Sequence, residues 1–373
     1  FVQVLPNIKY YLFINEVKKN NNEMINRMSL LDYYSSLKKK ENEIFFPVYS
    51  ANNQETINIG NKSILALGGI ANKKIIFCNE AGIWIDYKSD ELGFRNPQGI
   101  WDKKNIDIFI LGDSYGQGTC VENDKMVDHY LRKFYPNTLN LSYSMGGALI
   151  QLANLLEYGE IKKPKIVLNL FYSNDIPDTQ RENNNIILSN YKNGKKQNLY
   201  YHRKLINKKL IEKSNQIYNK YLQNKITPTK TTFGKKDFSY KQLIKLTNLR
   251  NSAGLPNLFE MKNRLNLDLY FSVIKQNKKI TESWNGNFLF IYLPTYQELS
   301  GFNYISRSSD LIYEEIVNFL QKNNINYLDF RKIFLERKLT SDDIYRYNGS
   351  HYNEGGYEVI GEEILNYLNK NYD

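Results

Sequence analysis

The chain has 373 residues, 42% of them hydrophobic and 24% charged, and its formal net charge is +11 at pH 7. This length and composition fit a folded protein with one large domain plus additions. No run reaches the roughly 18 apolar residues that a membrane span needs. No CxxC pair or histidine cluster indicates a metal site, so we expect no cofactor.

Residues 1–104 open with helical-looking segments and continue with short alternating runs. We expect the runs Ile57–Leu67, Lys74–Cys78 and Gly82–Tyr87 to form a small β-rich lead-in. Cys78 and Cys120 are the only cysteines; they allow one disulfide but do not imply one.

Residues 105–180 alternate between strand and helix patterns. The apolar run from Ile106 to Leu111 predicts a buried strand that ends at Gly112-Asp113-Ser114. Met126–Phe134 and Ala148–Tyr158 predict helices, and the apolar runs near residues 139 and 167 predict the next two strands. This order favours a parallel sheet with right-handed crossovers.

The rest of the chain completes the same pattern after a long insertion. Residues 181–285 are polar and basic, with amphipathic helical stretches. Since they follow the third strand, we expect them at the active edge of the sheet, as a lid or substrate platform. After the insertion we expect four elements in chain order: strand Phe288–Leu293, helix Leu311–Leu320, strand Ile325–Phe330, and a last helix with Asn353 as its N-cap.

A serine at the end of a parallel strand can act as a nucleophile only if a base reaches it. The chain has three histidines. His129 lies in a helical pattern and His202 in a basic polar stretch, whereas His351 precedes the last helix on a loop. We therefore predict that His351 pairs with Ser114.

Four blocks in this order resemble the SGNH/GDSL hydrolases, and the segment from Tyr87 to Pro97 resembles the lead-in of large, often membrane-anchored members. The blocks are Gly112-Asp113-Ser114, the glycines at Gly146-Gly147, Asn174 after the third strand, and the His351 loop. The resemblance covers residues 105–180 and 286–373. It implies an α/β flavodoxin-like three-layer sandwich with a central parallel sheet, preceded by the lead-in at 1–104. The hydrolase-like domain would then span 105–373, with its mostly helical insertion at 181–285.

The resemblance also implies the roles of the site residues. Ser114 would attack an ester carbonyl while His351 takes its proton. The oxyanion would be bound by the N–H of Ser114, an N–H at Gly146 or Gly147, and the amide of Asn174. Asp113 would support this arrangement.

Two positions depart from the family pattern. The family has an aspartate three residues before the histidine, where this chain has Asn348. An amide can orient the imidazole but supplies no charge, so Asp342, Asp343 or a backbone carbonyl is the alternative. The second departure is Met145, which stands where the family's glycine falls if Ser144 is aligned, so that a shifted N–H would serve the oxyanion.

We expect an ester hydrolase that removes O-acyl groups, acetyl in particular, from a glycan or related surface molecule. The alternatives are an O-acyltransferase to a glycan hydroxyl and a catalytically weak or inactive glycan-binding or assembly protein. The excess positive charge at 191–250 is either a solvated face or a contact for an anionic surface. We expect no nucleic-acid partner, because no recognition motif accompanies the charge. The protein would be bacterial in type and extracytoplasmic or membrane-associated, through an anchor or signal upstream of Phe1.

Overall fold

The structure, a computed structural model, describes residues 30–226, 267–300 and 306–372, except residues 42, 52, 81, 83 and 348. Its centre is a sheet of five parallel strands in the order β10-β9-β8-β6-β7. The strands are β6 (Ile108–Leu111), β7 (Thr138–Asn140), β8 (Ile166–Phe171), β9 (Asn287–Tyr292) and β10 (Asn326–Asp329). The chain order reverses between β6 and β8, and ligands of such sheets bind at the carboxyl edge of that switch point.

Strands β6 and β8 are buried along their whole length. Parallel strands covered on both faces read as continuous apolar runs, which is why both were visible in the sequence. Leu111 pairs with Asn169, so the two strands end side by side. The residues that follow β6 and β8 therefore meet at one edge.

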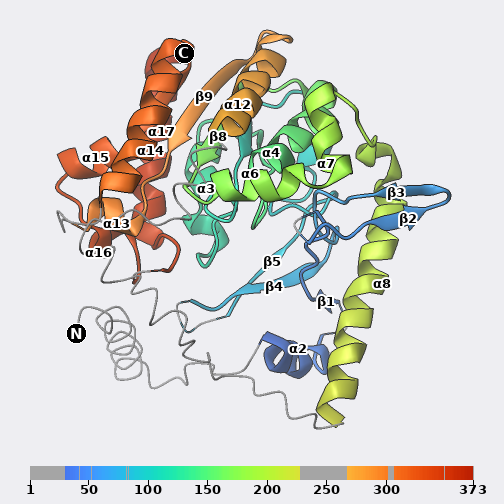
Figure 1. The fold of residues 1–373 in the computed structure, drawn as a ribbon. Coiled ribbons are helices and arrows are strands. Elements are labelled where there is room, and N and C mark those ends of the chain that lie inside the picture. Colours follow the sequence, from blue (N-terminus) through green and yellow to red (C-terminus); the bar gives the residue numbers. More distant parts are fainter. Residues whose placement is uncertain are drawn as a thin grey trace, which may run out of the picture.

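Helices cover both faces of this sheet, as Figure 1 shows. Phe109 and Leu111 pack with one set of helices, whereas Ile108 and Ile110 pack with the other. The first set is α4 (Ala148–Asn154), α6 (Asp175–Asn183), α12 (Leu267–Glu282) and α14 (Ser306–Lys322). The second set is α3 (Val127–Arg132), α15 (Phe330–Glu336) and α17 (Glu354–Tyr372). The predicted α/β three-layer sandwich with a parallel sheet is confirmed.

The other described helices are short except one. They are α5 (Glu160–Lys162), α7 (Ile186–Asn190), α8 (Leu199–Ile226), α13 (Tyr296–Leu299) and α16 (Ser341–Ile344), with 3₁₀ turns at Ile100–Asp102, Asn123–Lys125 and Tyr191–Asn193. The helix expected at Ala148–Tyr158 is α4, which continues as a π-helical turn at Leu155–Gly159. The expected insertion is helical where it is described, and its residues 227–266 lie outside the described part.

The lead-in forms its own small sheet. Strand β4 (Lys74–Cys78) pairs with β1 (Ile44–Phe45) on one side and with β5 (Ile85–Lys88) on the other. A separate hairpin joins β2 (Ile57–Ile59) to β3 (Lys62–Ile64). The predicted β-rich lead-in is confirmed. Apolar side chains of the lead-in share one buried cluster with the large sheet, and the domain boundary at residues 104 and 105 stays a prediction.

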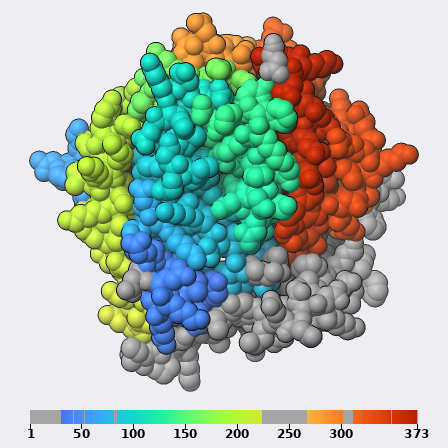
Figure 2. Space-filling view, turned by 180° about the vertical axis from the view of Figure 1, so that it is seen from behind, coloured from blue at the N-terminus to red at the C-terminus, as the bar shows by residue number. Residues whose placement is uncertain are grey.

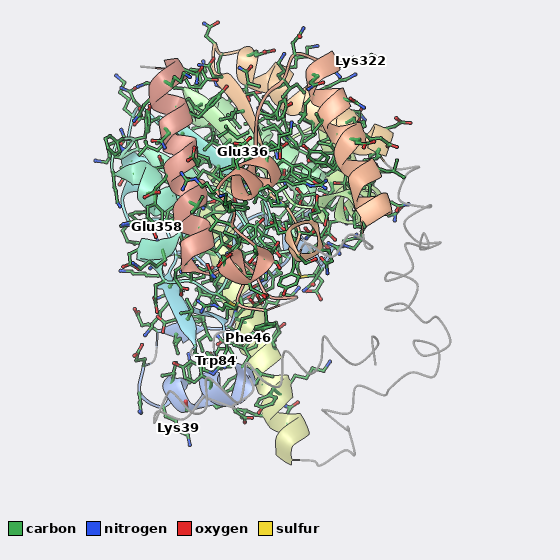
Figure 3. All side chains as sticks on the ribbon, turned by 90° about the vertical axis from the view of Figure 1, so that its left-hand side faces the viewer. Lys39, Phe46, Trp84, Lys322, Glu336 and Glu358 are labelled. Atoms are coloured by element: carbon green, nitrogen blue, oxygen red, sulfur yellow. A yellow bond between two sulfur atoms is a disulfide. The ribbon has the colours of Figure 1, made fainter. Side chains whose placement is uncertain are left out.

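Helix α2 (Leu30–Lys38) and the 28-residue α8 enclose a smaller apolar cluster at the far end of the lead-in. Figure 3 labels two of its side chains, Phe46 and Trp84. Seen from behind in Figure 2, the red surface of α17 lies against the green surface that includes α3. Within the described ranges, no helix combines the length and apolar character of a membrane span.

Candidate active site

Three side chains from distant parts of the chain form a line of hydrogen bonds. The Oγ of Ser114 lies 2.9 Å from Nε2 of His351, as predicted for a nucleophile and its base. On the other side of the imidazole, Nδ1 lies 2.7 Å from Oε1 of Glu80. Because a carboxylate only accepts, Nδ1 carries the ring proton, and the lone pair of Nε2 faces the serine hydroxyl. This is the arrangement of a catalytic triad.

Glu80 binds His351 twice. Its second oxygen, Oε2, accepts the backbone N–H of His351 at 2.8 Å. The side chains of His351 and Glu80 are 20% and 22% exposed, so the pair lies near the surface without being open to bulk water. A carboxylate that takes both N–H groups of one residue fixes the rotation of the ring as well as its tautomer.

Neither aspartate considered for this place binds His351. Asn348 lies outside the described residues. Asp342 accepts a hydrogen bond from the hydroxyl of Tyr296, and Asp343 accepts two from Thr340 in a capping box. Glu80 was not singled out in the sequence, because no local pattern links it to a histidine 271 positions away.

The turn after β6 presents Ser114 at the edge of the sheet. Oδ1 of Asp113 accepts the N–H of Tyr115 at 2.8 Å, which closes the turn around the serine. A side chain at Gly116 would place its Cβ 2.3 Å from Oγ of Ser142, so only glycine allows this turn to approach β7. The motif residues thus have separate tasks: Asp113 shapes the turn and Gly116 lets it pack.

The loop of His351 is held by the last helix and by aromatic side chains. Asn353 accepts the N–H of Gly356 at 2.9 Å, which confirms it as the N-cap of α17. The ring of Tyr115 lies 4.8 Å from the imidazole and stacks on Tyr172 at 3.7 Å. These contacts limit the sideways movement of His351.

Asn174 follows β8 and faces Asp113. Its Nδ2 donates to Oδ2 of Asp113 at 2.9 Å and, over a longer distance of 3.3 Å, to Oδ2 of Asp178. Burial raises the pKa of Asp113, against the hydrogen bonds it accepts from Asn174 and Tyr115. Burial also raises the pKa of Asp178 to about 6. The amide of Asn174 lies beside Ser114, with its two N–H groups directed at two carboxyl groups.

Nearly all backbone N–H groups of the loop before α4 donate hydrogen bonds within the protein. The N–H of Gly146 donates to the carbonyl of Tyr143 at 3.0 Å, and that of Gly147 to Oε1 of Glu182 at 2.5 Å. The neighbouring backbone N–H groups also donate to side chains: Ser144 to Gln117, Ala148 to Thr179, and Leu149 and Ile150 to Glu182. The two glycine amides expected at the oxyanion therefore already have acceptors.

Met145 is the exception in this loop. Among the residues that the structure describes, its N–H has no hydrogen-bond acceptor, and the same holds for the N–H of Ser114. Its φ of +65° lies in the left-handed region, which glycine adopts without strain and other residues do not. The carbonyl of Met145 accepts a hydrogen bond from the side chain of Arg181 at 3.2 Å. Met145 is therefore held through its carbonyl, while its N–H has no acceptor among the described residues.

One group of potential metal ligands occurs in the described part of the chain, formed by Cys78, Glu80 and Cys120. The two sulfurs are joined in a disulfide, and the carboxylate binds His351. Neither sulfur is therefore a thiolate that could bind a metal.

The cysteine pair was the one sequence signal that could have found Glu80. If Cys78 is bonded to Cys120, the residues just after Cys78 must lie close to the turn that follows Ser114. The sequence left that pairing open, and therefore it did not indicate that Glu80 lies near Ser114.

The parallel sheet with helices on both faces places the chain in the doubly wound α/β class, with Ser114, His351 and Asn174 at the carboxyl edge of its switch point. The family model described as GDSL-like Lipase/Acylhydrolase matches residues 108–364. The chain belongs to this family, and it is an esterase or acyl hydrolase. The predicted family is thus confirmed. No curated protein matches the chain in sequence.

The solved structures to which the chain is similar are distant from it in sequence. A putative acylhydrolase from Bacteroides fragilis is 11% identical, with 73% of this chain and 92% of that chain covered and a TM-score of 0.37. A putative lipolytic protein of the G-D-S-L family from Desulfitobacterium hafniense is 12% identical, with 70% and 99% covered and a TM-score of 0.38. The psychrotrophic esterase EstA from Pseudoalteromonas sp. is 16% identical, with 71% and 98% covered and a TM-score of 0.37.

Proposed function

We propose that this esterase uses Ser114 as its nucleophile, His351 as its general base and Glu80 as the acid of the triad. The observation that carries this proposal is the unbroken line of contacts, 2.9 Å from Ser114 to His351 and 2.7 Å from His351 to Glu80. The negative charge of Glu80 stabilises the imidazolium that forms during attack, which an amide at the same place could not do.

The reaction follows from these positions. Oγ of Ser114 adds to the ester carbonyl carbon as its proton moves to Nε2 of His351. The imidazolium then gives that proton to the leaving alkoxide oxygen, and an acyl-serine remains. Water attacks this intermediate, passes a proton to His351, and releases the acid while Ser114 recovers its hydrogen.

Three donors serve the negative charge on the carbonyl oxygen in this proposal. The N–H groups of Ser114 and Met145 have no acceptor among the described residues, so they meet the charge without breaking another bond. The third donor is the Asn174 N–H that now makes the long contact to Asp178. Met145 thus takes the place that the sequence assigned to Gly146 or Gly147.

The substrate that fits best is a small acyl group, acetyl in particular, on a glycan or related surface molecule. Ser114, Asn174 and His351 are half-buried at the sheet edge, so an ester on a large carrier can reach them. Helices α6 and α7 follow Asn174 directly, so the insertion begins at the site before it leads into α8. The basic residues of α8 support a contact with an anionic carrier, although residues 227–250 of that stretch lie outside the described part.

Hydrolysis is favoured over an inactive binding protein because the two departures from the family pattern have structural replacements. Glu80 supplies the charge that Asn348 lacks, and the N–H of Met145 has no acceptor among the described residues, so that it can serve in place of a glycine N–H. Transfer to a glycan hydroxyl uses the same acyl-serine and remains an arm of the test.

The disulfide between Cys78 and Cys120 supports the proposed extracytoplasmic or membrane-associated location. Disulfides persist in oxidising compartments and are rare where glutathione and thioredoxin keep thiols reduced.

The test combines active-site labelling with a substrate panel. A serine-reactive phosphonate should abolish hydrolysis of p-nitrophenyl acetate and add its mass to the peptide that contains Ser114. Acetate release from O-acetylated polysaccharides, compared with release from longer p-nitrophenyl esters, should favour the acetylated polymers. Acyl groups that appear on an added acceptor glycan instead of as free acid would identify a transferase. A label on another serine, with Ser114 unmodified, would overturn the proposal.

A further inference from the structure

The disulfide joins two parts of the proposed triad. Cys78 is the last residue of β4, just ahead of Glu80, and Cys120 lies in the turn that begins at Ser114. The Cα atoms of the two cysteines are 5.2 Å apart, within the usual range for a disulfide. The covalent bond therefore ties the segment that carries the acid to the turn that carries the nucleophile.

Both carboxylate oxygens of Glu80 bind His351, and among the described residues Glu80 makes no other hydrogen bond through its side chain or backbone. Glu80 lies just beyond Cys78, where the ladder between β4 and β5 ends after a register shift between Ile76 and Cys78. A residue that orients a catalytic base must be placed to within about 0.5 Å. The disulfide at Cys78 is a covalent tie between this segment and the rest of the site.

Cys120 stands on a firm base. Arg95 is 3% exposed and donates to the carbonyls of Gly118 and Val121, each at 2.7 Å. Arg346, from the segment that leads to His351, donates to the carbonyl of Cys120 at 3.4 Å. Cys120 itself is 1% exposed and has a left-handed φ of +66°, which the surrounding contacts must maintain.

We propose that the Cys78–Cys120 disulfide is a positioning element of the triad, which holds Glu80 against His351 from the firm base at Cys120. The esterase therefore reaches its full rate only in the oxidised form. This inference rests on the proposed roles of Ser114, His351 and Glu80.

Reduction by a dithiol breaks the link in a balanced step. Two electrons and two protons pass from the dithiol to the S–S bond, two cysteine thiols form, and the dithiol becomes its own disulfide. The end of β4 then gains freedom and Glu80 leaves its place for part of the time. A misplacement of about 1 Å can cost about 10²-fold in rate, so we expect kcat to fall about 10- to 100-fold. The KM should stay nearly constant, since neither cysteine lies among the oxyanion donors.

The decisive experiment is a double-mutant cycle. It compares oxidised protein, dithiothreitol-reduced protein and the C78S/C120S variant, each with Glu80 present and with Glu80→Ala, which removes the acceptor from Nδ1. Values of kcat and KM on p-nitrophenyl acetate are measured well below the thermal midpoint of every form. Dithiothreitol on C78S/C120S is the control for effects of the reagent, and reduction of the unaltered protein keeps the test valid if that variant does not fold.

The expected result is a fall in kcat when Glu80 is present and no further fall when it is Ala, because the bond acts through Glu80. An equal fall in both backgrounds would show a merely structural disulfide and overturn the proposal, as would an unchanged kcat after complete reduction. Full activity of Glu80→Ala would instead overturn the triad assignment underneath it, so the two failures are distinguishable.

Discussion

The five-stranded sheet and the lead-in approach His351 from opposite sides, and they are built differently. On the Nε2 side, Ser114 stands on a turn that follows a buried parallel strand and is shaped by Asp113 and Gly116. On the Nδ1 side, Glu80 stands beyond a strand end and is tied down by a disulfide. Figure 1 shows the β4–β5 hairpin below the five-stranded sheet. Sheet topology thus places the reacting atoms, while the charge that supports them comes from a structure added outside the sheet.

The largest test of this comparison removes the contribution of the sheet. Ser114→Ala should lower kcat on p-nitrophenyl acetate by about 10⁶-fold, because no other group can form the acyl intermediate. Ser173, half-buried at the end of the neighbouring strand, provides the control: Ser173→Ala should keep its activity. Residual turnover above about one per cent in a correctly folded Ser114→Ala protein would argue against the nucleophile assigned here.

The second test removes the contribution of the lead-in. Glu80→Gln keeps an acceptor near Nδ1 but loses the charge, and the corresponding change in chymotrypsin-like proteases lowers kcat about 10⁴-fold. We expect a fall of roughly 10²- to 10⁴-fold in kcat, measured by steady-state kinetics.

Asn348→Asp is the matched control for that loss. It restores the family's carboxylate at a position outside the described residues, and it should change kcat little while Glu80 occupies Nδ1. A large gain from Asn348→Asp, with a small loss from Glu80→Gln, would return the orienting role to position 348.

The third test addresses how the lead-in is joined to the sheet. Asp90 is fully buried and accepts N–H groups of Leu92, Phe94, Asn96 and Trp101; Asn96 in turn donates to Asn140 of β7. Burial raises the pKa of Asp90 to about 6, against those hydrogen bonds. A raised folded-state pKa contributes stability that is fully present below about 3.8 and lost as pH rises through about 6.

The unfolding free energy of the unaltered protein minus that of Asp90→Asn should therefore be greater at pH 4 than at pH 7. The difference should be on the order of 2–3 kcal/mol, from urea titrations at the two pH values. A difference that is flat, or that grows with pH, would mean that the surrounding N–H groups outweigh burial.

The smallest expected effect sharpens the account of the sheet edge. If Met145 acts through its N–H, Met145→Gly should keep kcat within a few-fold, because the peptide remains. Glycine also removes the left-handed strain of about 1 kcal/mol, which stabilises the folded state. It raises the conformational entropy of the unfolded chain, which costs a similar free energy, so the thermal midpoint should hardly move. Asn174→Ala is the contrast, with an expected loss of about 10²- to 10³-fold in kcat. A hundredfold loss in Met145→Gly would assign the function to the methionine side chain.

The sequence allowed the prediction of what strands and their ends encode locally. Continuous apolar runs located β6 and β8, and their alternation with helices predicted the parallel sheet that brings Ser114 and Asn174 to one edge. The polar pattern before α17 located His351 and its N-cap Asn353.

The contact of Glu80 with His351, and the unusual N–H of Met145 in the loop before α4, could not be predicted from the sequence, for physical reasons. Glu80 meets His351 across 271 positions, and the contact depends on a pairing of cysteines that spacing alone cannot fix. The N–H of Met145 stands out because, among the described residues, it has no acceptor, whereas Gln117, Glu182 and Thr179 from other parts of the chain accept the N–H groups around it. An N–H group without an acceptor can be recognised only when the hydrogen bonds of the surrounding N–H groups are known from the structure.

The order of the triad along the chain has a consequence for how the enzyme comes into being. Glu80 leaves the ribosome first, Ser114 next, and His351 only after β9, α14 and β10 have been made. Domains tend to fold from the N-terminal side during synthesis. A partly made chain can therefore carry its serine and its carboxylate without the base between them. In the proposed mechanism, ester hydrolysis begins only when the loop of His351 docks between Ser114 and Glu80, so the growing polypeptide is inactive until then.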